Sequence, residues 1–159
     1  MARMQRAKGQ RGERELLALI TKLLADRGHE LTLHRNHAQT ECGGADCLDI
    51  PGVALEVKRQ ENIQIASWWR QAISQAKATS RLPVLGYRRN RADWAILVPT
   101  YAATGLDYPI QRFQKRTQLP AAYRMTLAEF TNFYLDWRIR TAPIAPRPQP
   151  VTIGGLSLE

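Results

Sequence analysis

A short stretch in the first half of the chain carries charge where a β-strand is usually apolar. Glu56 and Lys58 alternate with valine and leucine over residues 53–58, which is the two-residue period of a strand with two different faces. A Pro-Gly turn signal precedes it, and two aspartates, Asp46 and Asp49, lie before the turn. Carboxylates are the oxygen ligands that Mg²⁺ prefers, and a neighbouring lysine can stabilise charge on a phosphoryl group. The stretch therefore predicts a divalent-metal site suited to phosphodiester hydrolysis.

A third acid lies near the start of the chain. Glu13 stands at the end of the apolar stripe of a helix predicted over residues 12–27. An acid on a core-facing stripe needs a partner, and a metal site at the sheet edge would supply one. The alternative is that Glu13 interacts only with the N-terminus of its own helix.

The residues alone leave open which aspartate joins Glu56. A tight two-residue turn at Pro51-Gly52 would place Asp49 opposite Ala54, on the face of Glu56 and Lys58. A one-residue change in the loop reverses this parity and favours Asp46.

The elements that must position these residues alternate between helix and strand. We expect helices over residues 12–27 and 62–79 and a last helix that opens at the capping box Thr126–Glu129, with strands over residues 31–35, 53–58, 82–87 and 94–98. Residues 37–44 read as a loop and residues 99–125 as irregular. This order predicts an α/β fold with a central mixed β-sheet flanked by helices. We expect one domain over residues 1–140 and a Pro-rich tail over residues 141–159.

The composition indicates a basic, soluble protein. The 159 residues carry a formal net charge of +9, and 18 of the 23 Lys and Arg residues are arginines, which suit phosphate binding. The expected partner is a polyanion, and specifically nucleic acid. No apolar run is long enough for a membrane helix, so no membrane role is expected. Two cysteines and no export signal favour the cytoplasm.

The order of several short blocks resembles a known superfamily. Lys8-Gly9, Glu13-Arg14-Glu15-Leu16, Gly44-Ala45-Asp46 and Leu55-Glu56-Val57-Lys58 resemble the PD-(D/E)XK nucleases, most closely the archaeal-type Holliday-junction resolvases and phage-encoded endonucleases. Gln71-Ala72 and the segment from Pro83 to Trp94 resemble the phage group. The resemblance implies the mixed sheet flanked by helices and a homodimer.

The resemblance also implies site residues. Asp46 and Glu56 would be metal ligands, Lys58 the catalytic lysine, Glu13 the helix acid that completes the site, and Gln71 a glutamine facing it. The family motif has a proline before the acid, whereas Ala45 precedes Asp46 and Leu48 precedes Asp49. The family spacing between the acids favours Asp46. The basic residues expected at nucleic acid are Lys8, Arg11, Arg35, Arg59, Arg88, Arg89 and Arg91.

The expected activity is a Mg²⁺-dependent DNA endonuclease, with Mn²⁺ able to substitute, acting on branched DNA such as a Holliday junction. One alternative is a less structure-selective phage or restriction-type nuclease. Others are a non-catalytic DNA-binding protein that keeps the nuclease fold, and a nuclease of structured RNA.

Overall fold

The computed structural model describes residues 2–36, 44–105 and 121–141, with side chains in the first helix from residue 9 onwards. Its elements follow one another in the order α1 (Ala2–Ala25), β1 (Val53–Arg59), α3 (Ile65–Thr79), β2 (Leu82–Arg88), β3 (Ala95–Pro99), α4 (Thr100–Ala103), β4 (Ala122–Thr126) and α5 (Leu127–Thr141).

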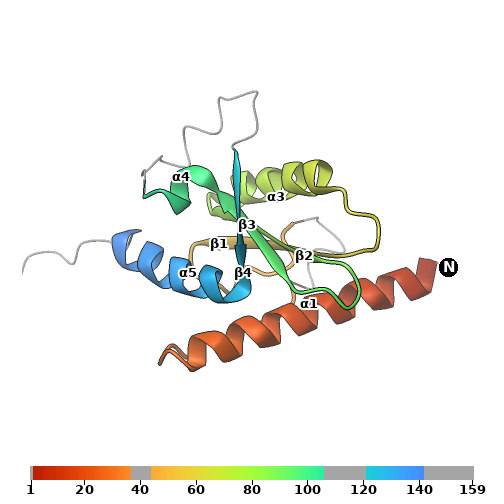
Figure 1. Ribbon diagram of the computed structural model, residues 1–159, viewed down its shortest axis with the longest axis horizontal. Helices are drawn as coiled ribbons and strands as arrows, with labels where there is room; N and C mark the ends of the chain where they lie inside the picture. Colours follow the sequence, from red (N-terminus) through yellow and green to blue (C-terminus); the bar gives the residue numbers. More distant parts are fainter. Residues whose placement is uncertain (1, 37–43, 106–120, 142–159) are drawn as a thin grey trace, which may run out of the picture.

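The four strands form one mixed sheet in the order β1-β2-β3-β4. β1 and β2 are parallel and are connected through α3, as a parallel pair requires a crossover. β2–β3 and β3–β4 are antiparallel neighbours. α3 lies on one side of the sheet and α1 and α5 on the other (Figure 1). The predicted α/β fold with a mixed sheet flanked by helices is confirmed.

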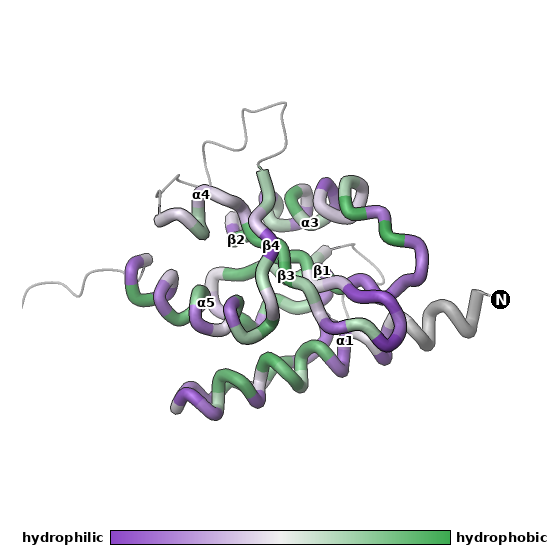
Figure 2. Tube along the Cα trace, viewed as in Figure 1, coloured by the Kyte–Doolittle hydropathy of each residue, from purple (hydrophilic) through white to green (hydrophobic). Residues whose placement is uncertain are grey.

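Apolar side chains fill the space on both faces of the sheet. On one face the stripe of α1, with Leu16, Ile20 and Leu24, packs with β1 and with Phe130 of α5. On the other face Trp68, Trp69 and Ile73 of α3 pack on β2 and β3. Figure 2 shows the apolar central strands and the strongly hydrophilic turn between β2 and β3. β1 is an edge strand covered on both faces, so its functional side chains are positioned by a rigid core.

α1 is longer than the apolar pattern predicts. It begins at Ala2, ten residues before the expected start at Gly12, and ends at Ala25. Residues 2–11 lack an apolar stripe but include alanine, glutamine, lysine and arginine, which form helices well. The stop is where the sequence indicates, because Gly28 adopts a φ of 79° and His29 N donates to Leu24 O at 3.0 Å. The apolar pattern of the sequence therefore predicts only the part of α1 that packs on the sheet.

Two expectations about strands are wrong. Residues 31–35 form no strand. The end of this segment contacts the residues before β1 through Asn36, whose N donates to Asp46 O at 2.8 Å. The region 99–125 is not wholly irregular, because it contains α4 and the edge strand β4. Four of the five residues of β4 are exposed, so it has no alternating apolar pattern to detect.

The capping box of α5 is confirmed. Thr126 N donates to Glu129 Oε2 at 2.6 Å, and Glu129 N donates to Thr126 Oγ1 at 3.2 Å. The tail from residue 142 and most of the loop predicted over residues 37–44 lie outside the described residues. Among the described helices, none combines the length and the apolar character that a bilayer span requires.

Candidate active site

The register of one isolated bridge places Asp46 beside Glu56. Cys47 and Leu55 pair antiparallel, with N···O distances of 3.2 and 3.1 Å in the two directions. Antiparallel pairing then sets Asp46 across from Glu56, with both side chains on the same face of the sheet. Asp49 falls across from Val53, and its carboxylate instead contacts the ring of His34 at 2.9 Å. The register differs by one residue from that of a two-residue turn.

The side chain of Asp46 accepts a hydrogen bond that a main-chain carbonyl would accept in a regular sheet. Its Oδ2 accepts a hydrogen bond from Val57 N at 2.6 Å, where a paired strand would offer a carbonyl oxygen. The neighbouring carbonyl of Ala45 accepts from the side chain of Asn36 at 3.0 Å instead. Asp46 is buried. The carboxylate is therefore fixed in place by the backbone of the strand that carries Glu56.

Glu56 is a buried carboxylate with an altered acidity. Its side chain is 1% exposed, and Lys58 Nζ lies 2.6 Å from Oε1. Burial and the charge of Asp46 raise the pKa of Glu56 to about 7, while Lys58 and Gln75 oppose the shift. Neither carboxylate oxygen has a well-aligned hydrogen bond with the described residues, because Lys58 and Gln75 lie close to it without that alignment. Such a carboxylate favours a neighbouring positive charge, and in the protein alone Lys58 supplies it.

The two acids open onto a cleft of about 540 Å³. It is lined by Gly9, Glu13, Asp46, Glu56, Val57, Lys58, Arg59, Gln60, Glu61, Asn62 and Gln71. Mg²⁺ usually binds to proteins through one or two carboxylates together with water and substrate phosphate. Asp46 and Glu56 fit this ion, since the bridge between Cys47 and Leu55 sets the two carboxylates side by side and both line the cleft.

Glu13 lines the same cleft but faces another partner. Arg35 Nε donates to Glu13 Oε2, and the side chains are only 16% and 13% exposed, respectively. In the described part of the chain, no three His, Cys, Asp or Glu side chains form a group that could hold a metal ion. α1 covers the face of β1 opposite to Glu56, so Glu13 reaches the cleft around the sheet edge.

Two glutamines of α3 stand near the acids at successive turns. Gln71 lines the cleft with an exposed side chain. Gln75 comes one turn later and lies close enough to Glu56 to lower its pKa, and its own Oε1 is buried without a hydrogen-bond partner in the described residues. The sequence pattern marks both as one polar stripe of the helix, but it does not indicate that Gln75 is the one nearer to Glu56.

A protein-family model matches the sequence over nearly the whole chain. The family "Phage putative PDDEXK endonuclease" matches residues 4–138. The chain belongs to this family. A comparison with curated proteins gives no match. Among solved structures, the fold is similar to Hjc, a Holliday junction resolvase from the archaeal hyperthermophile Archaeoglobus fulgidus. The identity is 19% and the TM-score 0.46, covering 79% of this chain and 96% of that one.

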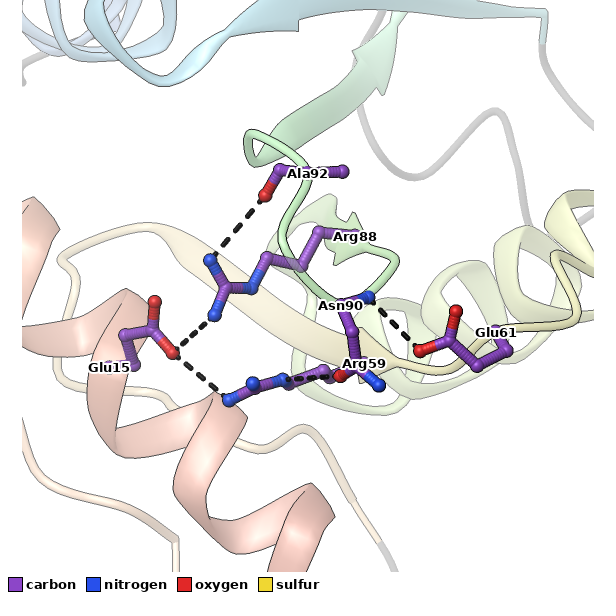
Figure 3. Close-up of polar contacts among 6 residues, drawn as sticks. All are labelled: Glu15, Arg59, Glu61, Arg88, Asn90 and Ala92. Atoms are coloured by element: carbon purple, nitrogen blue, oxygen red, sulfur yellow. Dashed lines mark hydrogen bonds and ion pairs between the residues drawn. The ribbon is translucent and has the colours of Figure 1, made fainter.

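Two arginines of this PDDEXK-family protein share one carboxylate beside the cleft (Figure 3). Arg59 Nη1 and Arg88 Nη2 lie 3.2 and 2.6 Å from Glu15 Oε2. Arg59 is the last residue of β1 and Arg88 the last residue of β2, and the two are register partners in this parallel pair. The guanidinium of Arg88 also lies 4.9 Å from the ring centroid of Trp94. Arg59 and Arg88 thus tie α1 to both strands.

The turn between β2 and β3 is hydrogen-bonded to Arg59 and to Glu61, which lies just after β1. Asn90 Oδ1 accepts from Arg59 Nε at 3.3 Å, and Asn90 N donates to Glu61 Oε1 at 3.2 Å. Arg89 and Arg91 are exposed on this turn, and Arg91 has a φ of 60°, in the left-handed region that a side chain disfavours.

The seven basic residues expected at nucleic acid thus differ in their surroundings. Arg35, Arg59 and Arg88 form ion pairs within the protein, while Arg11, Arg89 and Arg91 are exposed. The side chain of Lys8 lies outside the described part of α1.

Proposed function

We propose that this protein is a metal-dependent endonuclease that hydrolyses phosphodiester bonds in branched DNA such as a Holliday junction. The observation that carries the proposal is the placement of Asp46 across from Glu56 with Lys58 2.6 Å away, in a cleft of about 540 Å³. Membership of a phage PDDEXK endonuclease family supports the same chemistry.

Each residue of the cleft has a role in this proposal. Asp46 and Glu56 bind Mg²⁺, or Mn²⁺ in its place, and Glu13 completes the acidic lining. When bound, the ion neutralises phosphate charge and activates water for attack. Lys58 projects its ammonium from the same strand face as Glu56 and stabilises negative charge that develops on the phosphoryl oxygens. Gln71 contacts the substrate from the helix side of the cleft.

The substrate class rests on charge and on motif order. A net charge of +9 favours a polyanion, and the order of the short sequence blocks resembles that of archaeal-type resolvases. Two copies of the chain related by a two-fold axis would place two clefts against a junction that has the same symmetry. We therefore propose a homodimer that acts on DNA in the cytoplasm.

The strongest competing function is a DNA-binding protein without catalysis. Such a protein has no use for two buried carboxylates beside its ligand's phosphates, because each carboxylate costs desolvation and repels the phosphates. A nuclease without preference for branched DNA, and one that cleaves structured RNA, would use the same cleft, and a panel of substrates separates them.

The experiment compares cleavage of a labelled four-way junction, a linear duplex and a structured RNA, with a series of divalent metals that includes Mg²⁺ and Mn²⁺ or with EDTA. Wild type and Glu56→Gln are tested, with gel-shift binding on the same samples. Metal-dependent nicking of the junction that Glu56→Gln loses while it still binds DNA is the expected result. Equal cleavage of the duplex would remove the junction preference, and preferred cleavage of the RNA would change the substrate. Tight binding without cleavage in any divalent metal would overturn the enzymatic proposal.

A further inference from the structure

A second hollow lies along α1 and shares no lining residue with the acidic cleft. Its volume is about 490 Å³, and it runs between α1 and the segment 33–35. Its residues on α1 recur at intervals of three and four, so they form one continuous face of the helix. We call this hollow the α1 groove; it is lined by Arg14, Leu17, Ala18, Thr21, Lys22, Leu33, His34 and Arg35.

The ionisable side chains that line the α1 groove are all basic. Arg14 and Lys22 are exposed on the helix, and His34 and Arg35 face them from the neighbouring segment. No aspartate or glutamate is among the described lining residues; Glu13 and Asp49 contact Arg35 and His34 from outside the groove. Lys22 is eight positions after Arg14. This is about 12 Å along a helix and spans several phosphates of one DNA strand.

Arg35 connects the α1 groove to the acidic cleft. Its Nε donates to Glu13, which lines the cleft, while the residue itself lines the groove. The Nη groups of Arg35 form no hydrogen bond with the described residues, so they can bind a phosphate without breaking the contact to Glu13. Glu13 and Arg14 are adjacent on α1, so this one turn of helix contributes to both sites.

From this arrangement we infer that the α1 groove binds backbone phosphates of the same DNA molecule whose scissile phosphate occupies the cleft. The inference rests on the proposed function and adds a second contact region to it. Its apolar floor, Leu17 and Leu33, suits the sugar edge of the backbone, and its cations suit the phosphates. Arg14 and Lys22 are the phosphate ligands on the helix, and Arg35 is the ligand that joins the two sites.

The test measures DNA binding in EDTA as a function of salt, so that it does not depend on cleavage. Fluorescence anisotropy with a labelled duplex and a four-way junction compares wild type with Arg14→Ala/Lys22→Ala. Both positions are exposed on a helix, where alanine is well tolerated, and circular dichroism checks the fold. The matched control is Arg124→Ala/Arg140→Ala, which removes two exposed arginines from β4 and α5, away from both sites.

The groove variant should bind on the order of tenfold more weakly at moderate salt and lose about 1.8 from the slope of log K against log salt, because each lost phosphate contact contributes about 0.9. The control should keep the wild-type slope. An unchanged slope in the groove variant, or an equal loss in the control, overturns the inference. If wild type cleaves DNA while the groove variant binds normally, the inference alone fails. If wild type binds through the groove but cleaves nothing, the proposed function fails instead.

Discussion

Asp46 lies directly across from Glu56 because Cys47 pairs with Leu55 on the neighbouring segment. Two carboxylates so placed repel each other, and only a cation or a proton between them relieves the repulsion. In the protein alone, the raised pKa of Glu56, about 7, and the ammonium of Lys58 at 2.6 Å provide this relief. A divalent ion would therefore have to compete with both a proton and Lys58.

The register predicts different results for the two aspartates near the turn. Asp46→Asn should lower cleavage on the order of a hundredfold or more, since it removes one of the two charges that would bind the metal under the proposed function. The asparagine oxygen can still accept the hydrogen bond from Val57 N, so the fold should be kept. Asp49→Asn is the control, because the Asp49 carboxylate contacts His34 and does not line the cleft, so cleavage should stay near wild type. The measurement is the steady-state cleavage rate of each variant on the same DNA. A larger loss in Asp49→Asn than in Asp46→Asn would assign the site to Asp49.

Glu56 should make the metal-free protein less stable as the pH rises. Its pKa is raised from 4.5 to about 7, so between these values the folded protein holds a proton that the unfolded chain has released. The stabilisation from this group is complete below pH 4.5 and is lost as the pH rises through 7. Melting temperatures in EDTA from pH 5 to 8 should fall more steeply for wild type than for Glu56→Gln. Equal pH slopes would contradict the assignment.

Two glycines of α1 should respond oppositely to alanine. A Cβ at Gly12 would lie 2.9 Å from Arg59 Cβ, so Gly12→Ala forces α1 away from β1 and should lower the melting temperature. A Cβ at Gly9 would meet nothing within 4 Å, and Gly9→Ala should stabilise the helix by up to about 1 kcal/mol. Thermal unfolding of both variants tests the close approach. A stabilised Gly12→Ala would show that the helix is not packed as described.

Arg91 should be replaceable without loss of stability but not without loss of DNA binding. Its φ of 60° disfavours most side chains, whereas asparagine tolerates this region well. Arg91→Asn should therefore keep or raise the melting temperature and weaken DNA binding several-fold, because a phosphate contact is lost. Arg124→Asn, on the exposed face of β4, is the matched control for charge. Unchanged binding by Arg91→Asn would remove Arg91 from the DNA surface.

Local signals made parts of the fold predictable. The capping box at Thr126 and Glu129 needs only residues three apart in the sequence, and the stop at Gly28 needs one backbone angle. The strands 82–88 and 95–99 are buried and apolar, so their patterns are strong. β4 escaped prediction because an exposed edge strand buries too little to leave an alternating pattern.

The candidate site depends on contacts that no local pattern encodes. Whether Asp46 or Asp49 faces Glu56 is decided by one residue in the register, which the turn sets only when the whole sheet is formed. The partner of Glu13 is Arg35, which lies in a segment without regular structure. A periodic sequence pattern therefore cannot predict this ion pair. The sequence marks the residue types, while tertiary packing determines their partners.

The single carboxylate of Glu15 forms ion pairs with the guanidinium groups of both Arg59 and Arg88. Two positive charges thus face one carboxylate within this trio, next to the cleft and at the base of the turn that carries Arg89 and Arg91. Arg59 and Arg88 have already lost most of their rotamer freedom to Glu15, to Asn90 and to the ring of Trp94. A phosphate that binds these two arginines would therefore meet guanidinium groups that are already held in place, which lowers the entropic cost of ordering them.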